Sequence, residues 1–139
     1  MKSDEELFHE LSCYTLAHGD PAFIHQHIVD AYAAQHATEN SKPIGVVFGL
    51  VGLYLHVEKQ YTGREVQKAH MQMAKRRKDW PRLMPPKVEA KIGVADVLKA
   101  EPGSERDKQI RAWAAAVWES WRERRQEIVV LVERELGIR

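Results

Sequence analysis

The chain has 139 residues, 44% hydrophobic and 29% charged, which suits one globular domain with a buried core and excludes a disordered chain. Its 21 basic and 20 acidic residues give a formal net charge of +1, without the basic excess typical of nucleic-acid and membrane-surface proteins. Cys13 is the only cysteine, so an intramolecular disulfide is excluded and a reducing cytoplasm fits.

Two features argue against export and against a membrane partner. The first ten residues, MKSDEELFHE, are acidic and polar, unlike a signal peptide. The longest apolar segment, PIGVVFGLVGLYLHV at 43–57, is shorter than the about 20 apolar residues that a bilayer-spanning helix needs. We therefore expect a cytoplasmic protein in which residues 43–57 belong to a buried helix.

Helix start signals are clear in the first 40 residues. Ser3 and Glu6 form a capping-box pattern ahead of an apolar run, which predicts a first helix. Asp20 followed by Pro21 combines an N-cap residue with the residue preferred at the first helical position. This pair predicts a second helix over about 21–37.

Similar signals divide the middle of the chain. Pro43 opens a predicted helix that ends near Tyr61. Thr62 and Glu65 form another capping-box pattern, which predicts a helix that ends near Lys78.

Prolines and glycines interrupt the C-terminal half. The segment around 79–93 contains three prolines and is predicted to be an irregular surface connection. VADVLKA at 94–100 predicts a short helix, and Ser104 caps a last helix over about 105–136. Without internal repeats or alternating strand patterns, residues 1–139 are predicted to form a single all-α domain, a bundle of five to six helices, four of them long.

The predicted helix over 21–37 contains three histidines, His25, His27 and His36. Residues two apart on a helix diverge by about 200°, so His25 and His27 cannot hold one ion. His25 and His36 are about 16 Å apart along the axis, too far to share a metal. These two histidines share one edge of the apolar face with Tyr32, which is therefore a candidate ligand-binding residue.

Three glycines form a line on the predicted helix over 43–61. Gly45, Gly49 and Gly52 fall on one narrow strip, and His56 extends it by one turn. Each glycine costs a helix interior about 1 kcal/mol relative to alanine, so the strip needs a compensating reason. Close approach of a neighbouring helix or of a ligand is that reason, which makes Gly49 and Gly52 candidate ligand-binding positions.

A transition-metal site between helices is one interpretation of the histidines. Neutral imidazole binds zinc, nickel and iron, and a catalytic site leaves one coordination position for water. The sequence has no HExxH or CxxC motif that singles out a metal, and a hydrogen-bonded structural role for each histidine is the alternative. The candidate ligands, taken from three helices, are His25 or His36, His56 and His70.

Arg124 and Arg125 interrupt the apolar stripe of the predicted last helix. An unpaired buried guanidinium is costly. The two arginines therefore reach water, pair with carboxylates such as Asp30 or Glu58, or hold a small anionic ligand. Asp30 itself falls on the solvent side of its predicted helix.

Long stretches of the chain resemble an uncharacterised bacterial domain family of small soluble proteins. The resemblance is carried by YTLAHGDPAFIHQHIVDAYAAQH, by KPIGVVFGLVGLYLHVEKQYTGREVQKAHMQMAKRRKDWP, and by VADVLKA and AVWESW. It covers nearly the whole chain. It implies that the histidine-containing helix and the GLYLHVEK segment are the signature of that family, and it implies no activity.

Three functional hypotheses follow, none of which specifies a reaction. The first is a helical protein that binds a metal or a small anion in a pocket between the histidines, the glycine strip and the arginine pair. The second is a non-catalytic interaction module with structural histidines, a homodimer in which Trp118, beside the apolar stripe, contacts the partner copy. The third and weakest is a nucleic-acid accessory that uses the basic run at 75–78.

Overall fold

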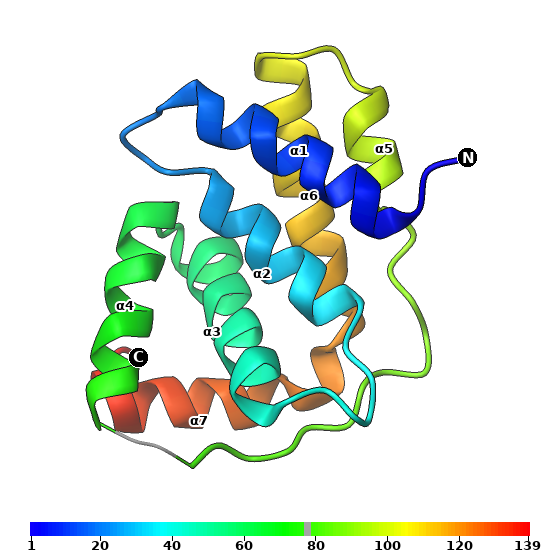
Figure 1. Ribbon diagram of the computed structural model, residues 1–139. Helices are drawn as coiled ribbons and strands as arrows, with labels where there is room; N and C mark the ends of the chain where they lie inside the picture. The colour runs from blue at the N-terminus through cyan, green and yellow to red at the C-terminus, as the bar shows by residue number, and fades with distance from the viewer. Residues whose placement is uncertain (77–78) are drawn as a thin grey trace.

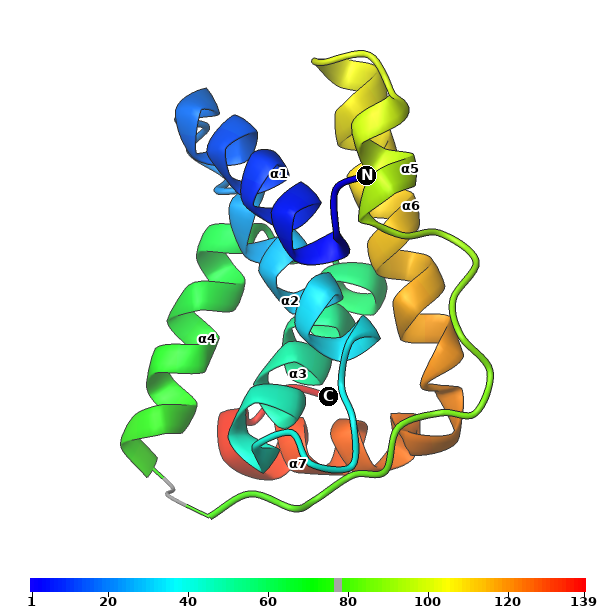
Figure 2. The same ribbon diagram turned by 45° about the vertical axis from the view of Figure 1, so that its right-hand side comes forward.

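The computed structural model describes residues 1–76 and 79–139, and within these residues every regular element is a helix (Figure 1). The all-α prediction is therefore confirmed. The central α3 packs against α2, α4, α6 and α7, while α1 packs against α2 and α5, and α5 packs against α6 (Figures 1 and 2). In chain order the elements are α1 (Asp4–His18), α2 (His25–Gln35), α3 (Pro43–Lys59), α4 (Gly63–Arg76), α5 (Val94–Lys99), α6 (Ser104–Ser120), the 3-10 turn η1 (Arg122–Arg124) and α7 (Arg125–Leu136).

Two of the predicted capping boxes form. The Ser3 hydroxyl accepts a hydrogen bond from the Glu6 backbone N–H at 3.2 Å, and the Glu6 carboxylate accepts one from the Ser3 N–H at 3.2 Å. Thr62 and Glu65 make the same reciprocal pair at the start of α4, at 3.2 and 3.0 Å. These bonds satisfy backbone donors that the first turn of a helix leaves without partners.

The histidine-containing helix starts four residues later than predicted, at His25. The Asp20 carboxylate accepts a hydrogen bond from the backbone N–H of Ile24 at 3.0 Å, so it does act as a cap, but one turn ahead of the helix. Phe23 between them has a φ of 57°, a left-handed conformation that few non-glycine residues adopt. The turn over 20–24 therefore projects away from the axis of α2.

This turn is fixed against the start of α4. The backbone N–H of Arg64 donates to the Ala22 carbonyl at 2.9 Å. A Cβ atom added to Gly63 would lie 1.8 Å from the Phe23 carbonyl oxygen, so only glycine allows this approach. The contact positions the turn over one end of α3.

The glycine strip packs against α2, as the sequence predicts for two of its three members. A Cβ atom at Gly49 would lie 3.3 Å from the Asp30 carbonyl oxygen, and one at Gly52 would lie 1.9 Å from an Asp30 carboxyl oxygen. A Cβ atom at Gly45 would meet no side chain and no backbone of another segment within 4 Å among the described residues. The prediction that Asp30 faces solvent is wrong: it is 3% exposed, because the missing Cβ of Gly52 leaves room for its carboxyl group.

The predicted last helix is broken in two. After Ser120 the chain makes the 3-10 turn η1, and α7 then runs across the end of α3 (Figure 1). Trp121 lies at the break, almost fully buried, and its indole N–H donates to the Ala34 carbonyl at 3.2 Å. An apolar stripe does not distinguish a straight helix from two helices that bury the same side chains.

Trp118 does not serve as an exposed dimer contact. It is 5% exposed, and its indole N–H donates to the Glu58 carboxylate at 2.7 Å. The same carboxylate binds Arg125, which therefore has a protein partner. The homodimer itself stays a prediction from sequence.

The connection after α4 is irregular, as predicted, from 79 to 93. It is less exposed than a surface loop, since Trp80 and Leu83 are buried against the helices. The predicted end of the preceding helix near Lys78 and part of the basic run at 75–78 lie outside the described residues. In the part of the chain that the structure describes, no helix is both long and apolar enough to cross a membrane.

Candidate functional site

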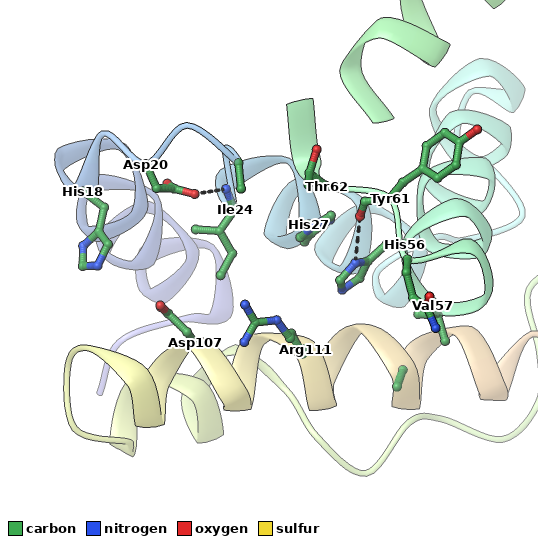
Figure 3. Close-up of a pocket in the computed structure, with 13 residues that line it drawn as sticks. His18, Asp20, Ile24, His27, His56, Val57, Tyr61, Thr62, Asp107 and Arg111 are labelled. Atoms are coloured by element: carbon green, nitrogen blue, oxygen red, sulfur yellow. Dashed lines mark hydrogen bonds between the residues drawn. The ribbon is translucent and has the colours of Figure 1, made fainter. Parts of the chain in front are cut away.

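A cavity of about 480 Å³ lies where the turn over 20–24 and the segment after α3 face the N-terminal half of α6 (Figure 3). Binding sites for small molecules usually have volumes of about 300–1,000 Å³. The walls include apolar side chains, and the polar residues that line the cavity come from several parts of the chain. These polar residues are His18, Asp20, His27, His56, Gln60, Tyr61, Thr62, Asp107 and Arg111.

Two stacked imidazoles form one side of this cavity. The rings of His27, from α2, and His56, from α3, have centroids 3.5 Å apart and planes inclined by 18°. His27 is 5% exposed. Burial, and to a smaller extent the charges of His56 and Arg111, lowers the pKa of His27 to about 3. Burial also lowers the pKa of His56, so two uncharged rings stack at neutral pH.

The hydrogen bond of His56 determines its tautomer. Its Nδ1 lies 3.3 Å from the Tyr61 carbonyl oxygen (Figure 3). Because a carbonyl only accepts, the neutral ring carries its proton on Nδ1 and presents Nε2 as an acceptor.

The other ring has an unsatisfied nitrogen. The Nδ1 atom of His27 is buried and has no hydrogen-bond partner among the described residues. Buried polar atoms are normally paired, so this one is notable at the wall of a cavity.

Asp107 and Arg111 enter the cavity from α6. They are four residues apart, a spacing at which opposite charges usually interact. In the described structure no ion pair joins them, and Arg111 makes no hydrogen bond to another described residue. One carboxyl oxygen of Asp107 is buried and also lacks a partner there. Neither charged group is therefore neutralised by an ion pair in the described part of the chain.

The four predicted metal ligands lie apart, and of these His56 alone lines the cavity. Among residues 1–76 and 79–139, no group of three or more His, Cys, Asp or Glu side chains is arranged to hold a metal ion. The predicted set does not converge because each ring is bonded to its own neighbour. His25 bonds to the Thr15 hydroxyl at 2.9 Å, His70 to the Phe48 carbonyl at 2.7 Å, and His36 to the Asp4 carboxylate at 3.1 Å.

The five predicted ligand-binding residues lie outside the cavity. Tyr32 stacks between the rings of Phe8 and His36, with centroids 4.2 and 4.1 Å away. Gly49 and Gly52 are covered by α2. Each of the two arginines pairs with a carboxylate of the protein: Arg125 with Glu58 at 2.7 and 2.5 Å, and Arg124 with Glu127 at 3.1 Å.

Sequence reasoning missed three of the residues that define the cavity. His27 is not among the candidate ligands, because the helical wheel places it away from the edge of the apolar face that His25 and His36 share. Asp107 and Arg111 match an ordinary solvated pair at the start of a helix, and nothing in their local sequence distinguishes them from one.

The model of a family of unknown function, DUF5946, matches residues 5–122 of the chain. The chain belongs to this family. The match confirms the resemblance to an uncharacterised domain family that the sequence indicates. In this DUF5946 member the matched range contains every residue that lines the cavity, whereas α7 lies beyond it. No curated protein and no solved structure is similar enough to the chain to match it.

Proposed function

We propose that this protein binds a small organic anion in the cavity between α2, α3 and α6. One observation carries the proposal: Arg111 lines the cavity and has no hydrogen-bond partner among the described residues. A guanidinium binds carboxylate and phosphate groups through paired N–H donors. A bound anion would satisfy Arg111.

The rest of the cavity supports a ligand with an apolar part. Ile24, Val57 and Ala115 contribute to its walls. Small-molecule sites commonly combine an apolar lining with a few polar groups that fix the orientation of the ligand. The neutral His56 ring adds an acceptor at Nε2 without adding charge. A carboxylate or phosphate on a modest apolar body fits this combination.

Metal binding, the alternative that the sequence raised, has less support from the geometry. Three histidines line the cavity, His18, His27 and His56. They are not arranged as a ligand group in the described part of the chain, because two of the rings stack face to face and a shared ion needs their nitrogens to converge. Metal dependence is nevertheless easy to test in the same experiment.

The test is calorimetric titration with 3-phenylpropanoate, benzoate and inorganic phosphate, in buffer with and without a chelator. We expect at least one of these anions to bind, and Arg111→Gln to weaken it by about tenfold or more, since a hydrogen bond between charged groups contributes about 1.5–3 kcal/mol. Arg122→Gln is the matched control, because it removes the same charge from a side chain that is exposed and outside the cavity. Absence of binding by all three anions, or equal affinity in both variants, would contradict the proposal.

A further inference from the structure

The cavity contains an unpaired carboxyl group as well as an unpaired guanidinium. One oxygen of Asp107 is buried without a partner among the described residues, one helical turn from Arg111. Two residues four apart on a helix are separated by a rise of about 6 Å along its axis. Figure 3 shows both side chains directed from α6 toward the turn that carries Ile24.

The position of Asp107 near the start of α6 does not account for this arrangement. Acidic side chains near a helix N-terminus interact favourably with the helix dipole, and they do so while exposed to solvent. Glu105, two residues earlier, is such a residue: it is exposed and pairs with Lys108 at 3.5 Å. Asp107 instead lines the cavity and has one buried carboxyl oxygen without a partner among the described residues, which is costly for an acceptor.

The charges around the cavity favour an anion that also carries a positive group. Two carboxyl groups, Asp20 and Asp107, and one guanidinium, Arg111, line it. Asp20 already accepts a hydrogen bond from the backbone N–H of Ile24, whereas the buried oxygen of Asp107 does not have a donor. A ligand that carried only negative charge would satisfy Arg111 and be repelled by the carboxylate one turn away.

We propose that the ligand is a zwitterion, an amino acid with an apolar side chain or a similar small molecule, whose carboxylate pairs with Arg111 and whose ammonium group pairs with Asp107. This inference rests on the proposed function and names the ligand class of the same cavity. An ammonium group donates three hydrogen bonds and carries no acceptor, so it suits the Asp107 carboxylate, which lines the cavity. The apolar side chain would face Ile24, Val57 and Ala115.

The experiment is a matched set of calorimetric titrations on the full chain. The probes are L-phenylalanine, 3-phenylpropanoate, which lacks the ammonium group, and 2-phenylethylamine, which lacks the carboxylate; L-leucine, 4-methylpentanoate and isopentylamine form a second set. We expect the amino acid of at least one set to bind at least about tenfold more tightly than its acid and its amine.

Variants then assign the discrimination to one residue. Asp107→Asn should remove the advantage of the amino acid over the acid and leave the affinity for the acid unchanged or higher. Glu105→Gln, which removes a neighbouring charge outside the cavity, should leave the preference intact. The comparison of the three probes on the unmodified protein does not depend on how well any variant folds.

The outcomes separate this inference from the proposed function. If the acid binds as tightly as the amino acid, and Asp107→Asn changes neither affinity, the zwitterion proposal is overturned while anion binding stands. If neither amino acids nor acids bind, both proposals are overturned. Tight binding of the amine alone would overturn both as well, because the carboxylate would then contribute nothing.

Discussion

The imidazole ring of His27 lies against that of His56, with 3.5 Å between their centroids and 18° between their planes. One ring comes from α2 and the other from α3, so their contact depends on the close packing of these two helices. Stacking at this distance suits neutral rings, because two imidazolium charges would repel each other strongly. The state of the pair therefore depends on pH.

The first prediction concerns this pH dependence. His27 has a native pKa of about 3, against an ordinary value of about 6.5, so between these values the unfolded chain binds a proton that the native chain does not. The contribution of the neutral ring to the free energy of unfolding is fully present above pH 6.5. It is lost as the pH falls toward 3, by at most about 1.4 kcal/mol per pH unit. Urea unfolding at pH 7 and pH 5 should show that the free energy of unfolding falls more for the parent than for His27→Gln between these two pH values.

His9→Gln provides the control for this comparison. His9 is exposed at the surface of α1, outside the cavity, so its replacement should leave the pH dependence of the parent unchanged. Equal pH dependence in the parent and in His27→Gln would mean that the ring is not held neutral in the native state.

The second prediction concerns the contact between α2 and α3. Gly52→Ala should destabilise the protein by about 1–3 kcal/mol or more, because the added methyl group would lie 1.9 Å from an oxygen of Asp30, whose side chain is buried. Gly45→Ala, in the same helix, where the added Cβ would meet no side chain and no backbone of another segment within 4 Å among the described residues, should be neutral or stabilising by up to about 1 kcal/mol. Chemical denaturation of both variants measures the difference. Equal stabilities would show that the strip is not a packing surface.

The sequence predicts this contact and fails at the cavity for identifiable physical reasons. Caps such as Ser3 with Glu6 and a glycine strip on one face are local signals, and both identify structure correctly. The burial of Asp30 is not a local property, since a helical wheel directs it outward and only the absent Cβ of Gly52 makes room for it.

The formation of the cavity depends even more on contacts between segments that are distant in the sequence. It requires the left-handed turn at Phe23 to project over α3, and it requires Asp107 and Arg111 to face that turn instead of each other. The sequence does not predict the helix break near Trp121 either, because the apolar stripe continues through it. Each of these features depends on how distant segments meet.

The third prediction concerns Asp30. Burial raises the pKa of its carboxyl group well above the usual range, and the hydrogen bond from Gln26 opposes this only in part. The native group thus keeps its proton at pH values where the unfolded chain has lost it. Its contribution to stability is fully present below the unfolded pKa of about 3.9 and is lost as the pH rises toward the native pKa, by at most about 1.4 kcal/mol per unit.

Replacement by asparagine removes this titration and keeps an acceptor for Gln26. We expect Asp30→Asn to gain stability relative to the parent as the pH is raised from 4.5 to 7.5, measured by urea unfolding at several pH values. Glu101→Gln, at an exposed position, should follow the parent across this range. A constant difference in unfolding free energy between Asp30→Asn and the parent would show that Asp30 is ionised in the native protein.

The fourth prediction concerns Glu58, which joins the two segments on either side of the helix break. Its carboxylate accepts a hydrogen bond from the Trp118 indole at 2.7 Å and pairs with Arg125 of α7. Glu58→Ala should cost about 1–3 kcal/mol, because the buried indole N–H loses its acceptor. Glu58→Gln should cost less, about 0–1 kcal/mol, because an amide oxygen still accepts from the indole while a half-exposed ion pair contributes little.

The control removes an ion pair without affecting an indole. Glu127→Ala takes the partner from Arg124 at an exposed site, and we expect a change of less than about 1 kcal/mol. Urea unfolding at low and high salt completes the test, since salt should reduce the difference between the parent and Glu58→Gln and leave most of the cost of Glu58→Ala. Equal losses in the two Glu58 variants would assign the effect to the ion pair, and the indole hydrogen bond would then not hold the helix break in place.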